Sequence, residues 1–322
     1  MRNDRIIVAV TASFENKEEL LHTLKKYAQR TDDQFAYWDE FAFTTEIPGE
    51  CDAVLVLNSP GSPLETLCES NKVIAFMMEP GIRSEHPWMF RMLDQYNEVY
   101  TPVPASRNTI PSHGFLGWYF KQDYNWLKTL PIPVKTKQVS CISSNLSQLP
   151  GHRLRLDFLA QVKARFPQID IFGKGTNYLA DKMEGLLPYR YSIAIENSSK
   201  DDYFTEKIND CFLAYTIPVY YGCRNIDRYF PKRSFIRIDL NSQASALQKI
   251  QEILATDDWQ DRLEAVQEAR ELVLHKYQPL AGAANIFRSM KEPAPKKNIS
   301  LLPVRKNIVD SLKSFMRRWT HA

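Results

Sequence analysis

Short, mostly apolar runs alternate along the chain with stretches in which apolar residues recur at helical spacing. Runs at 5–11, 53–57 and 73–78 have the length of strands and few polar residues, as expected for strands buried on both faces of a parallel sheet. Between the first two runs, residues 17–29 predict a helix, because its leucines recur on one face and Asn16 can cap its N-terminus.

The first half continues with a helix expected over 87–95 and a short strand near 98–101. Residues 102–136 are different, because they are rich in proline and aromatic residues, and their apolar positions follow neither the helical period nor the strand period. We therefore predict a first domain over 1–136, in which 102–136 form the connection to a second domain.

A second alternating series predicts a second domain over 137–290. Its expected strands and helices are the strands 138–142, 169–172, 191–195, 217–222 and 234–239, and the helices 152–165, 243–255 and 258–277, with one more helix beginning near 206. Strands that alternate with helices favour parallel sheets. The expected fold class is therefore α/β, with two such domains in series and a cleft between them.

Polar residues gather where the predicted strand 191–195 ends and the next helix begins. They are Glu196, Asn197, Tyr203, Glu206 and Lys207. Ligands of open α/β sheets bind at the carboxyl ends of strands, and a helix N-terminus there attracts phosphate. This junction therefore predicts a site for a nucleotide diphosphate. Two other interpretations stay open: Glu206 and Lys207 as a solvated surface pair, and Glu196 as a structural carboxylate that bonds backbone N–H groups.

The composition is that of a globular protein, with 322 residues, 44% of them hydrophobic and 25% charged. No apolar run approaches the roughly 18–20 residues of a membrane span. The N-terminus leads directly into a strand-like run and has no signal-peptide pattern. The five cysteines are scattered without metal-binding spacing, which favours reduced core thiols. We expect a cytoplasmic protein.

The charge is unevenly distributed, although the net charge is only +3. Residues 291–322 contain eight basic and two acidic residues, which leaves −3 on residues 1–290. Within this tail, 304–319 predict a basic amphipathic helix that suits an anionic membrane surface, here the inner face of the cytoplasmic membrane. The alternative is a helix that docks on the N-terminal domain. No basic stripe of the kind that nucleic acid requires is present in the remainder of the chain, so no nucleic-acid partner is expected.

Three motifs together resemble those of the family 10 α1,3/1,4-fucosyltransferases. They are Glu196-Asn197-Ser198, the run 202–207 and the run 217–222. The resemblance covers roughly residues 139–240, and in the first half it is carried mainly by 76–80.

This resemblance implies the GT-B fold, in which two Rossmann-like domains face a cleft. It implies inverting transfer of L-fucose from GDP-β-L-fucose to a glycan hydroxyl, such as O3 of GlcNAc or Glc in lipopolysaccharide, O-antigen or a lipid-linked glycan. No cofactor is expected and no metal-binding residue is assigned, although a divalent cation could stimulate transfer. The alternatives are the same fold with another nucleotide-activated sugar, and a non-catalytic nucleotide- or glycan-binding protein.

For the donor, the resemblance implies that Arg153 and Lys207 contact the diphosphate. It also implies that Tyr203, Glu206 and Asn197 shape the donor pocket, with Glu196 beside them. Arg is suited to phosphate by its planar fork and Lys by its point charge. Arg155, two residues from Arg153, is the alternative for the phosphate contact, and a helix cap is the alternative role for Arg153.

For the acceptor, inversion requires a general base opposite the leaving group. The resemblance implies Glu79, which follows the predicted strand 73–78 directly and precedes Pro80. Glu85 is the second candidate, and a carboxylate that only stabilises its loop is the other interpretation of Glu79.

Overall fold

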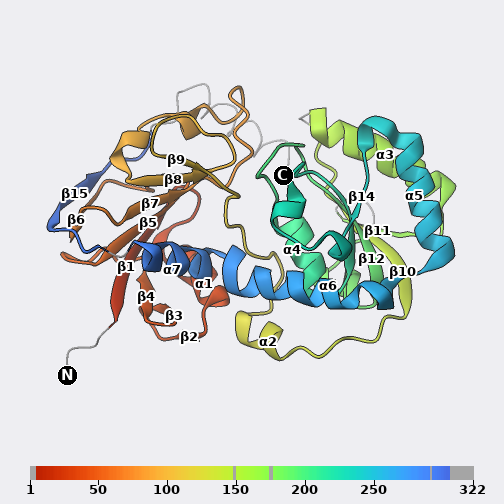
Figure 1. Cartoon of the computed structure of the whole chain (residues 1–322), viewed down its shortest axis with the longest axis horizontal. Coiled ribbons are helices and arrows are strands. Elements are labelled where there is room, and N and C mark those ends of the chain that lie inside the picture. The colour runs from red at the N-terminus through yellow and green to blue at the C-terminus, as the bar shows by residue number, and fades with distance from the viewer. Residues whose placement is uncertain (1–4, 148–149, 174–176, 291, 305–322) are drawn as a thin grey trace.

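Each half of the chain contains one large sheet in which most strand pairs are parallel (Figure 1). The computed structural model describes residues 5–147, 150–173, 177–290 and 292–304. Over these residues, no helix is both long and apolar enough to cross a membrane. All five cysteines are buried free thiols, as predicted.

The N-terminal sheet has the strand order β2-β3-β4-β1-β5-β7-β8-β9. Its strands are β1 (Ile6–Ala12), β2 (Arg30–Thr31), β3 (Ala36–Trp38), β4 (Phe41–Thr44), β5 (Ala53–Leu57), β7 (Val73–Phe76), β8 (Glu98–Thr101) and β9 (Thr109–Pro111). Only the pairs β2–β3 and β3–β4 are antiparallel. Every residue of β5 and β7 is buried, which confirms the prediction from their apolar runs.

Helix α1 (Lys17–Tyr27) begins where its capping residue predicts. The Asn16 side chain accepts a hydrogen bond from the Glu19 N–H at 2.9 Å, and the Glu19 carboxylate accepts one from the Asn16 N–H at 3.4 Å. This reciprocal pair satisfies two N–H groups that the first turn leaves free. The helix ends at Tyr27, two residues before the predicted end.

The helix predicted over 87–95 is wrong. The segment forms two short 3₁₀ helices, Pro87–Phe90 and Leu93–Gln95, separated by Met92 at φ = 54°. A left-handed residue cannot continue a right-handed helix, so the helical pattern is interrupted there. The predicted connection 102–136 also contains β9 and a short helix, α2 (Tyr124–Thr129).

The C-terminal sheet is parallel throughout, with the order β11-β10-β12-β13-β14. Its elements are β10 (Lys137–Ile142), α3 (Pro150–Arg165), β11 (Asp170–Phe172), β12 (Tyr189–Ile195), α4 (Glu206–Leu213), β13 (Ile217–Tyr221), β14 (Ile236–Arg237), α5 (Gln243–Thr256) and α6 (Trp259–Leu272). The predicted strand 234–239 is shorter than expected, because Lys232–Ser234 form a 3₁₀ turn.

After α6 the chain returns to the N-terminal half. A π-helical turn (Val273–Tyr277) leads into α7 (Pro279–Ser289), which lies beside α1 (Figure 1). Arg288 of α7 forms ion pairs with Asp39 at 2.6 Å and Glu40 at 2.7 Å. The last helix of the domain predicted over 137–290 therefore packs on the other half.

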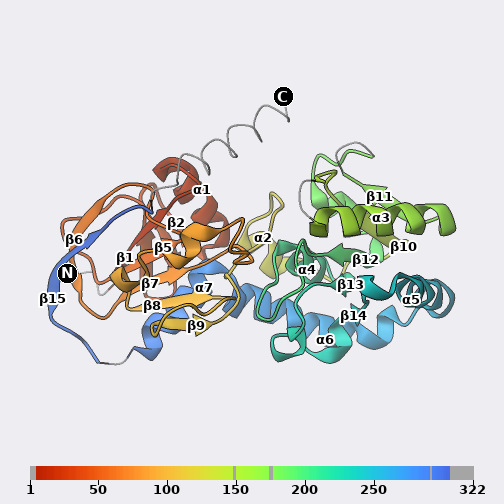
Figure 2. The same cartoon turned by 90° about the horizontal axis from the view of Figure 1, so that it is seen from above.

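The described part of the predicted tail 291–322 forms a strand. Strand β15 (Lys296–Leu301) pairs antiparallel with β6 (Leu64–Glu69), at the edge of the N-terminal half (Figure 2). Lys296 lies 2.8 Å from Glu50 and 3.0 Å from Asp52, so part of the basic charge is paired within the fold. The amphipathic helix predicted from 304 onward lies outside the described residues, except for Val304.

Candidate functional site

The candidate site starts at the carboxyl end of β12. This strand is flanked by β10 and β13 and is buried over its last five residues, and Glu196 and Asn197 follow it directly. A loop then leads to α4, whose N-cap is Thr205. The predicted order of strand, polar loop and helix is confirmed.

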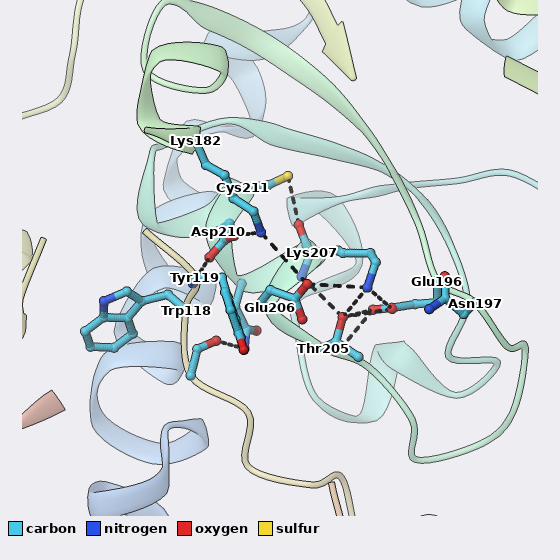
Figure 3. Close-up of polar contacts among 12 residues, drawn as sticks. Trp118, Tyr119, Lys182, Glu196, Asn197, Thr205, Glu206, Lys207, Asp210 and Cys211 are labelled. Atoms are coloured by element: carbon cyan, nitrogen blue, oxygen red, sulfur yellow. Dashed lines mark hydrogen bonds and ion pairs between the residues drawn. The ribbon is translucent and has the colours of Figure 1, made fainter. Parts of the chain in front are cut away.

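Glu196 connects the end of the strand to the start of this helix. Its side chain is fully buried, and it accepts hydrogen bonds from the Thr205 N–H at 2.8 Å and the Thr205 hydroxyl at 2.8 Å (Figure 3). Burial raises the pKa of Glu196, while the nearby Lys207 acts in the opposite direction. These contacts favour the structural interpretation of Glu196.

Lys207 is the central cation of the site. Its Nζ lies 3.2 Å from Glu196, 3.4 Å from Glu206 and 3.0 Å from the Thr205 hydroxyl. Although burial opposes it, the attraction of the two carboxylates raises the pKa of Lys207 above its usual value. Lys207 therefore carries its charge at neutral pH, and its side chain keeps 24% of its surface exposed.

Lys182 and Asp210 extend this cluster. Lys182 Nζ lies 2.9 Å from Asp210 and 3.9 Å from Glu206, and the other Asp210 oxygen accepts the Tyr119 N–H at 3.0 Å (Figure 3). Although burial opposes it, Lys207 and Lys182 lower the pKa of Glu206, so this carboxylate is ionised. Through Asp210 the cluster is connected to the segment that links the two halves.

Helix α3 brings Arg155, and not Arg153, to this site. Arg155 is 3% exposed and donates to the Asn197 side-chain oxygen at 2.6 Å and to the Ser144 carbonyl at 3.1 Å. Its Nε has no hydrogen-bond partner among the described residues. Arg153 is exposed, because two residues along an α-helix correspond to about 200° of rotation.

These residues line a cavity of about 350 Å³. Its polar walls include Ser144, Arg155, Lys182, Asn197, Glu206, Lys207 and Tyr119. The lining contains three cations, Arg155, Lys182 and Lys207, and the carboxylate of Glu206. Glu196 and Asp210 pair with the two lysines from outside the lining, so Arg155 is the cation of this lining without an ion pair among the described residues, and it favours a bound anion. Tyr203, also predicted for this pocket, is 5% exposed and is not part of its lining.

The predicted base lies in the N-terminal half. Glu79 follows β7 and lines a second cavity of about 340 Å³, together with Phe14, Lys26 and Tyr119. Its side chain is 46% exposed, and its carboxylate lies 3.5 Å from His86 Nε2. Glu85 lies in the following turn and does not line this cavity.

Two contacts bring the Glu79 cavity and the Lys207 cavity together. Tyr119 lines both of them. Lys200, in the loop after β12, donates a hydrogen bond to the carbonyl of Gly81 at 3.3 Å, two residues beyond Glu79. The structure thus places the candidate base and the cation cluster at adjoining cavities of the two halves.

Residues 132–262 match the family described as "Glycosyltransferase family 10 (fucosyltransferase) C-term". This part of the chain is similar to the C-terminal domain of family 10 glycosyltransferases. The matched segment includes Arg155, Lys182 and the whole cluster around Lys207.

Curated relatives match over part of their length. The chain is 25% identical over 202 residues to the 4-galactosyl-N-acetylglucosaminide 3-alpha-L-fucosyltransferase FUT6 of Homo sapiens, which covers 59% of this chain and 54% of that protein. It is 27% identical over 146 residues to a putative fucosyltransferase-like protein of Arabidopsis thaliana, covering 44% of this chain and 28% of that protein. The chain therefore spans about half the length of these relatives, or less.

Solved structures share the fold. An alpha1,3-fucosyltransferase crystal structure matches with a TM-score of 0.51 at 15% identity, covering 86% of this chain and 91% of that chain. The OtsA apo structure matches with a TM-score of 0.52 at 8% identity, covering 90% and 100%. These neighbours are GT-B glycosyltransferases, so the GT-B prediction is confirmed.

The sequence patterns missed Tyr119, Lys182 and Asp210. Tyr119 lies in the aperiodic connection, and Lys182 lies in a 3₁₀ turn (Lys182–Gly185) without strand or helix periodicity. For Arg155 a signal was present: it precedes Leu159 by four residues and Val162 by seven, which is the buried face of the predicted helix.

Proposed function

We propose that this chain transfers L-fucose from GDP-β-L-fucose to a glycan hydroxyl, with inversion at the anomeric carbon. The observation that carries the proposal is that the segment matching the family 10 domain contains the cation cluster around Lys207, in a cavity of about 350 Å³. We take the acceptor hydroxyl to be O3 of GlcNAc or Glc in a glycan such as lipopolysaccharide or O-antigen.

In this proposal the leaving GDP is held by Lys207 and Arg155. Negative charge grows on the diphosphate as the glycosidic bond breaks, and fixed donors placed there stabilise the transition state. Arg155 lines the cavity, and its Nε is buried without a hydrogen-bond partner among the described residues, so a shift of the guanidinium toward the ligand would let this N–H donate to a phosphate oxygen. Glu206, Glu196 and Thr205 keep Lys207 charged and fix the position of its ammonium.

The proposed base is Glu79. It would remove the proton of the acceptor hydroxyl while that oxygen attacks the anomeric carbon from the face opposite GDP. Its side chain is nearly half exposed in a cavity that adjoins the cation cluster at Tyr119, so an acceptor can reach it. His86, 3.5 Å from the Glu79 carboxylate, would orient it.

That the reaction needs no metal stays a prediction. Among the described residues, no group of three or more His, Cys, Asp or Glu side chains has the arrangement of a metal site. Dialysis against a chelator followed by turnover with and without a divalent cation tests this requirement directly.

Location is also part of the proposal. We place the enzyme in the cytoplasm, at the inner face of the membrane, where residues 304–319 would contact anionic lipid and bring the site to lipid-linked glycans. Co-sedimentation of the full chain with vesicles that contain anionic lipid tests this part. A chain ending at Val304 should lose the binding, and equal binding by both chains would contradict it.

The activity itself is tested by mass-spectrometric turnover with a donor panel and an array of acceptor glycans. We expect deoxyhexose transfer from GDP-fucose. Turnover only with another nucleotide sugar would leave the fold assignment intact and replace the proposed donor. Tight GDP binding without transfer from any donor would favour a non-catalytic binding protein.

A further inference from the structure

A third cavity, of about 420 Å³, lies between the two halves of the molecule. One wall is α1, with Thr23 and Lys26, and the opposite wall is formed by Asp181 and Lys182 of the C-terminal half. The linking segment at Tyr119 and Lys121 completes it. It adjoins both cavities of the proposed active site, because Tyr119 lines all three.

Tyr119 forms the wall that the three cavities share. Its side chain is 66% exposed, which is unusual for a large aromatic residue in a cavity wall. The Nζ atoms of Lys182 and Lys26 lie 5.4 Å and 5.9 Å from the ring centroid. An aromatic face beside polar groups is the usual composition of a small-molecule site.

The third cavity has an excess of positive charge. Lys26, Lys121 and Lys182 line it, and Asp181 is the carboxylate in its lining. Asp181 is already engaged, since it accepts the Gln122 amide at 2.9 Å and the Met183 N–H at 3.0 Å. Lys182 is paired with Asp210 outside the cavity wall.

Lys26 and Lys121 have no carboxylate within ion-pair distance among the described residues. Lys26 is partly buried and donates to the Trp118 carbonyl at 3.1 Å. Burial lowers the pKa of Lys26, and Asp210 and Glu15 act on it only from a distance. A partly desolvated ammonium facing a cavity is stabilised by a bound anion.

We propose that this cavity is a second acceptor subsite and that it binds a carboxylate or phosphate group carried by the acceptor glycan. The reacting sugar would lie beside Glu79, and the glycan would extend over Tyr119. Its anionic group would then contact Lys26 and Lys121. This inference rests on the proposed function, because it extends the acceptor site of that reaction.

The test compares a neutral glycan acceptor with two derivatives of it, one carrying a sugar carboxylate and one a phosphate on the residue next to the reacting sugar. We expect kcat/KM for at least one anionic derivative to exceed that for the neutral parent by roughly 10–100-fold, the size of one net charge-assisted hydrogen bond. The two derivatives distinguish the carboxylate source from the phosphate source.

Lys121→Met should reduce the ratio of kcat/KM for the anionic acceptor to kcat/KM for the neutral acceptor toward one. Lys121→Glu should bring this ratio below one. The matched control is Lys128→Met, which removes the same charge from an exposed lysine on the same linking segment that does not line the cavity. Lys26→Met should act like Lys121→Met. Equal kcat/KM for neutral and anionic acceptors, or equal effects of Lys121→Met and Lys128→Met, would overturn the subsite.

A binding measurement separates this inference from the proposed function. The same three glycans are titrated into the full chain with GDP bound, and their affinities are followed by NMR. Preferential binding of an anionic glycan that Lys121→Met abolishes supports the subsite even if GDP-fucose is not turned over. Transfer to the neutral glycan without any such preference supports the proposed function and refutes the subsite.

Discussion

Replacing Lys207 by methionine should destabilise the protein as well as inactivate it. Lys207 lies 3.2 Å from the carboxylate of Glu196, whose side chain is fully buried. Breaking a buried ion pair by removing one partner typically costs about 3–5 kcal/mol, because the other charge is left uncompensated. Glu196 keeps its two hydrogen bonds from Thr205, so we expect the free energy of unfolding to fall by about 3 kcal/mol, the low end of this range.

The assay is urea denaturation of the wild type, Lys207→Met and the double variant Glu196→Gln/Lys207→Met at several pH values. The double variant removes both charges and should recover most of the loss. The pKa of Glu196 is already raised by burial, and loss of Lys207 raises it further. Because the folded state then binds a proton more readily than the unfolded state, the deficit of Lys207→Met should be largest near neutral pH. It should shrink as the pH falls through the folded-state pKa of Glu196.

Two results would refute this reasoning. The first is a loss of stability in Lys207→Met that does not vary with pH. The second is a double variant as unstable as the single one. Either would mean that Lys207 stabilises the fold through packing of its aliphatic stem or through Glu206, and not through charge compensation of Glu196.

Three further predictions concern the proposed reaction. Arg155→Met should weaken GDP binding by roughly tenfold or more, whereas Arg153→Met should leave it nearly unchanged, as measured by calorimetry; the reverse order would restore the sequence-based assignment. Glu79→Gln should lower kcat by roughly 10²–10⁴-fold at unchanged GDP affinity, and Glu85→Gln is the matched control. A loss of kcat in Glu85→Gln alone would show that Glu85, and not Glu79, is the base. Gly151→Ala should lower the melting temperature and weaken GDP binding, because a Cβ there would lie 2.0 Å from the Asn197 carbonyl oxygen; wild-type values for both would show that α3 can shift freely.

The sequence predicted the C-terminal half of the fold well, for a physical reason. Parallel strands buried on both faces need continuous apolar runs, and the ligand-binding residues follow the end of such a run. Strand β12 and the residues from Glu196 to Lys207 are the clearest instance, because an apolar strand, a polar loop and a capped helix follow directly in sequence.

The elements that the sequence did not predict depend on contacts between distant segments. Strand β15 contains Lys296 and Lys297, so it resembles a basic tail, but lysine is also a common residue of edge strands. Its pairing with β6 joins residues more than 220 positions apart. No local pattern contains that information.

The site residues divide in the same way. Lys207 and Glu206 could be predicted because they lie beside the strand end in sequence. Tyr119 and Lys182 could not, because they reach the site only when the two halves come together. Arg153 was chosen over Arg155 from motif position, and the phase of α3 shows which of the two faces the cavity.

Transfer with GDP-fucose is the most direct test of the central claim, that the Lys207 cluster holds the diphosphate of a fucose donor. The purified full chain is incubated with GDP-fucose and an array of glycan acceptors, and products are read by mass spectrometry. We predict one added deoxyhexose per acceptor, with GDP released in equal amount, and loss of both in Lys207→Met under conditions where that variant remains folded. Full activity in the folded Lys207→Met variant, or no transfer from GDP-fucose to any acceptor, would contradict the account.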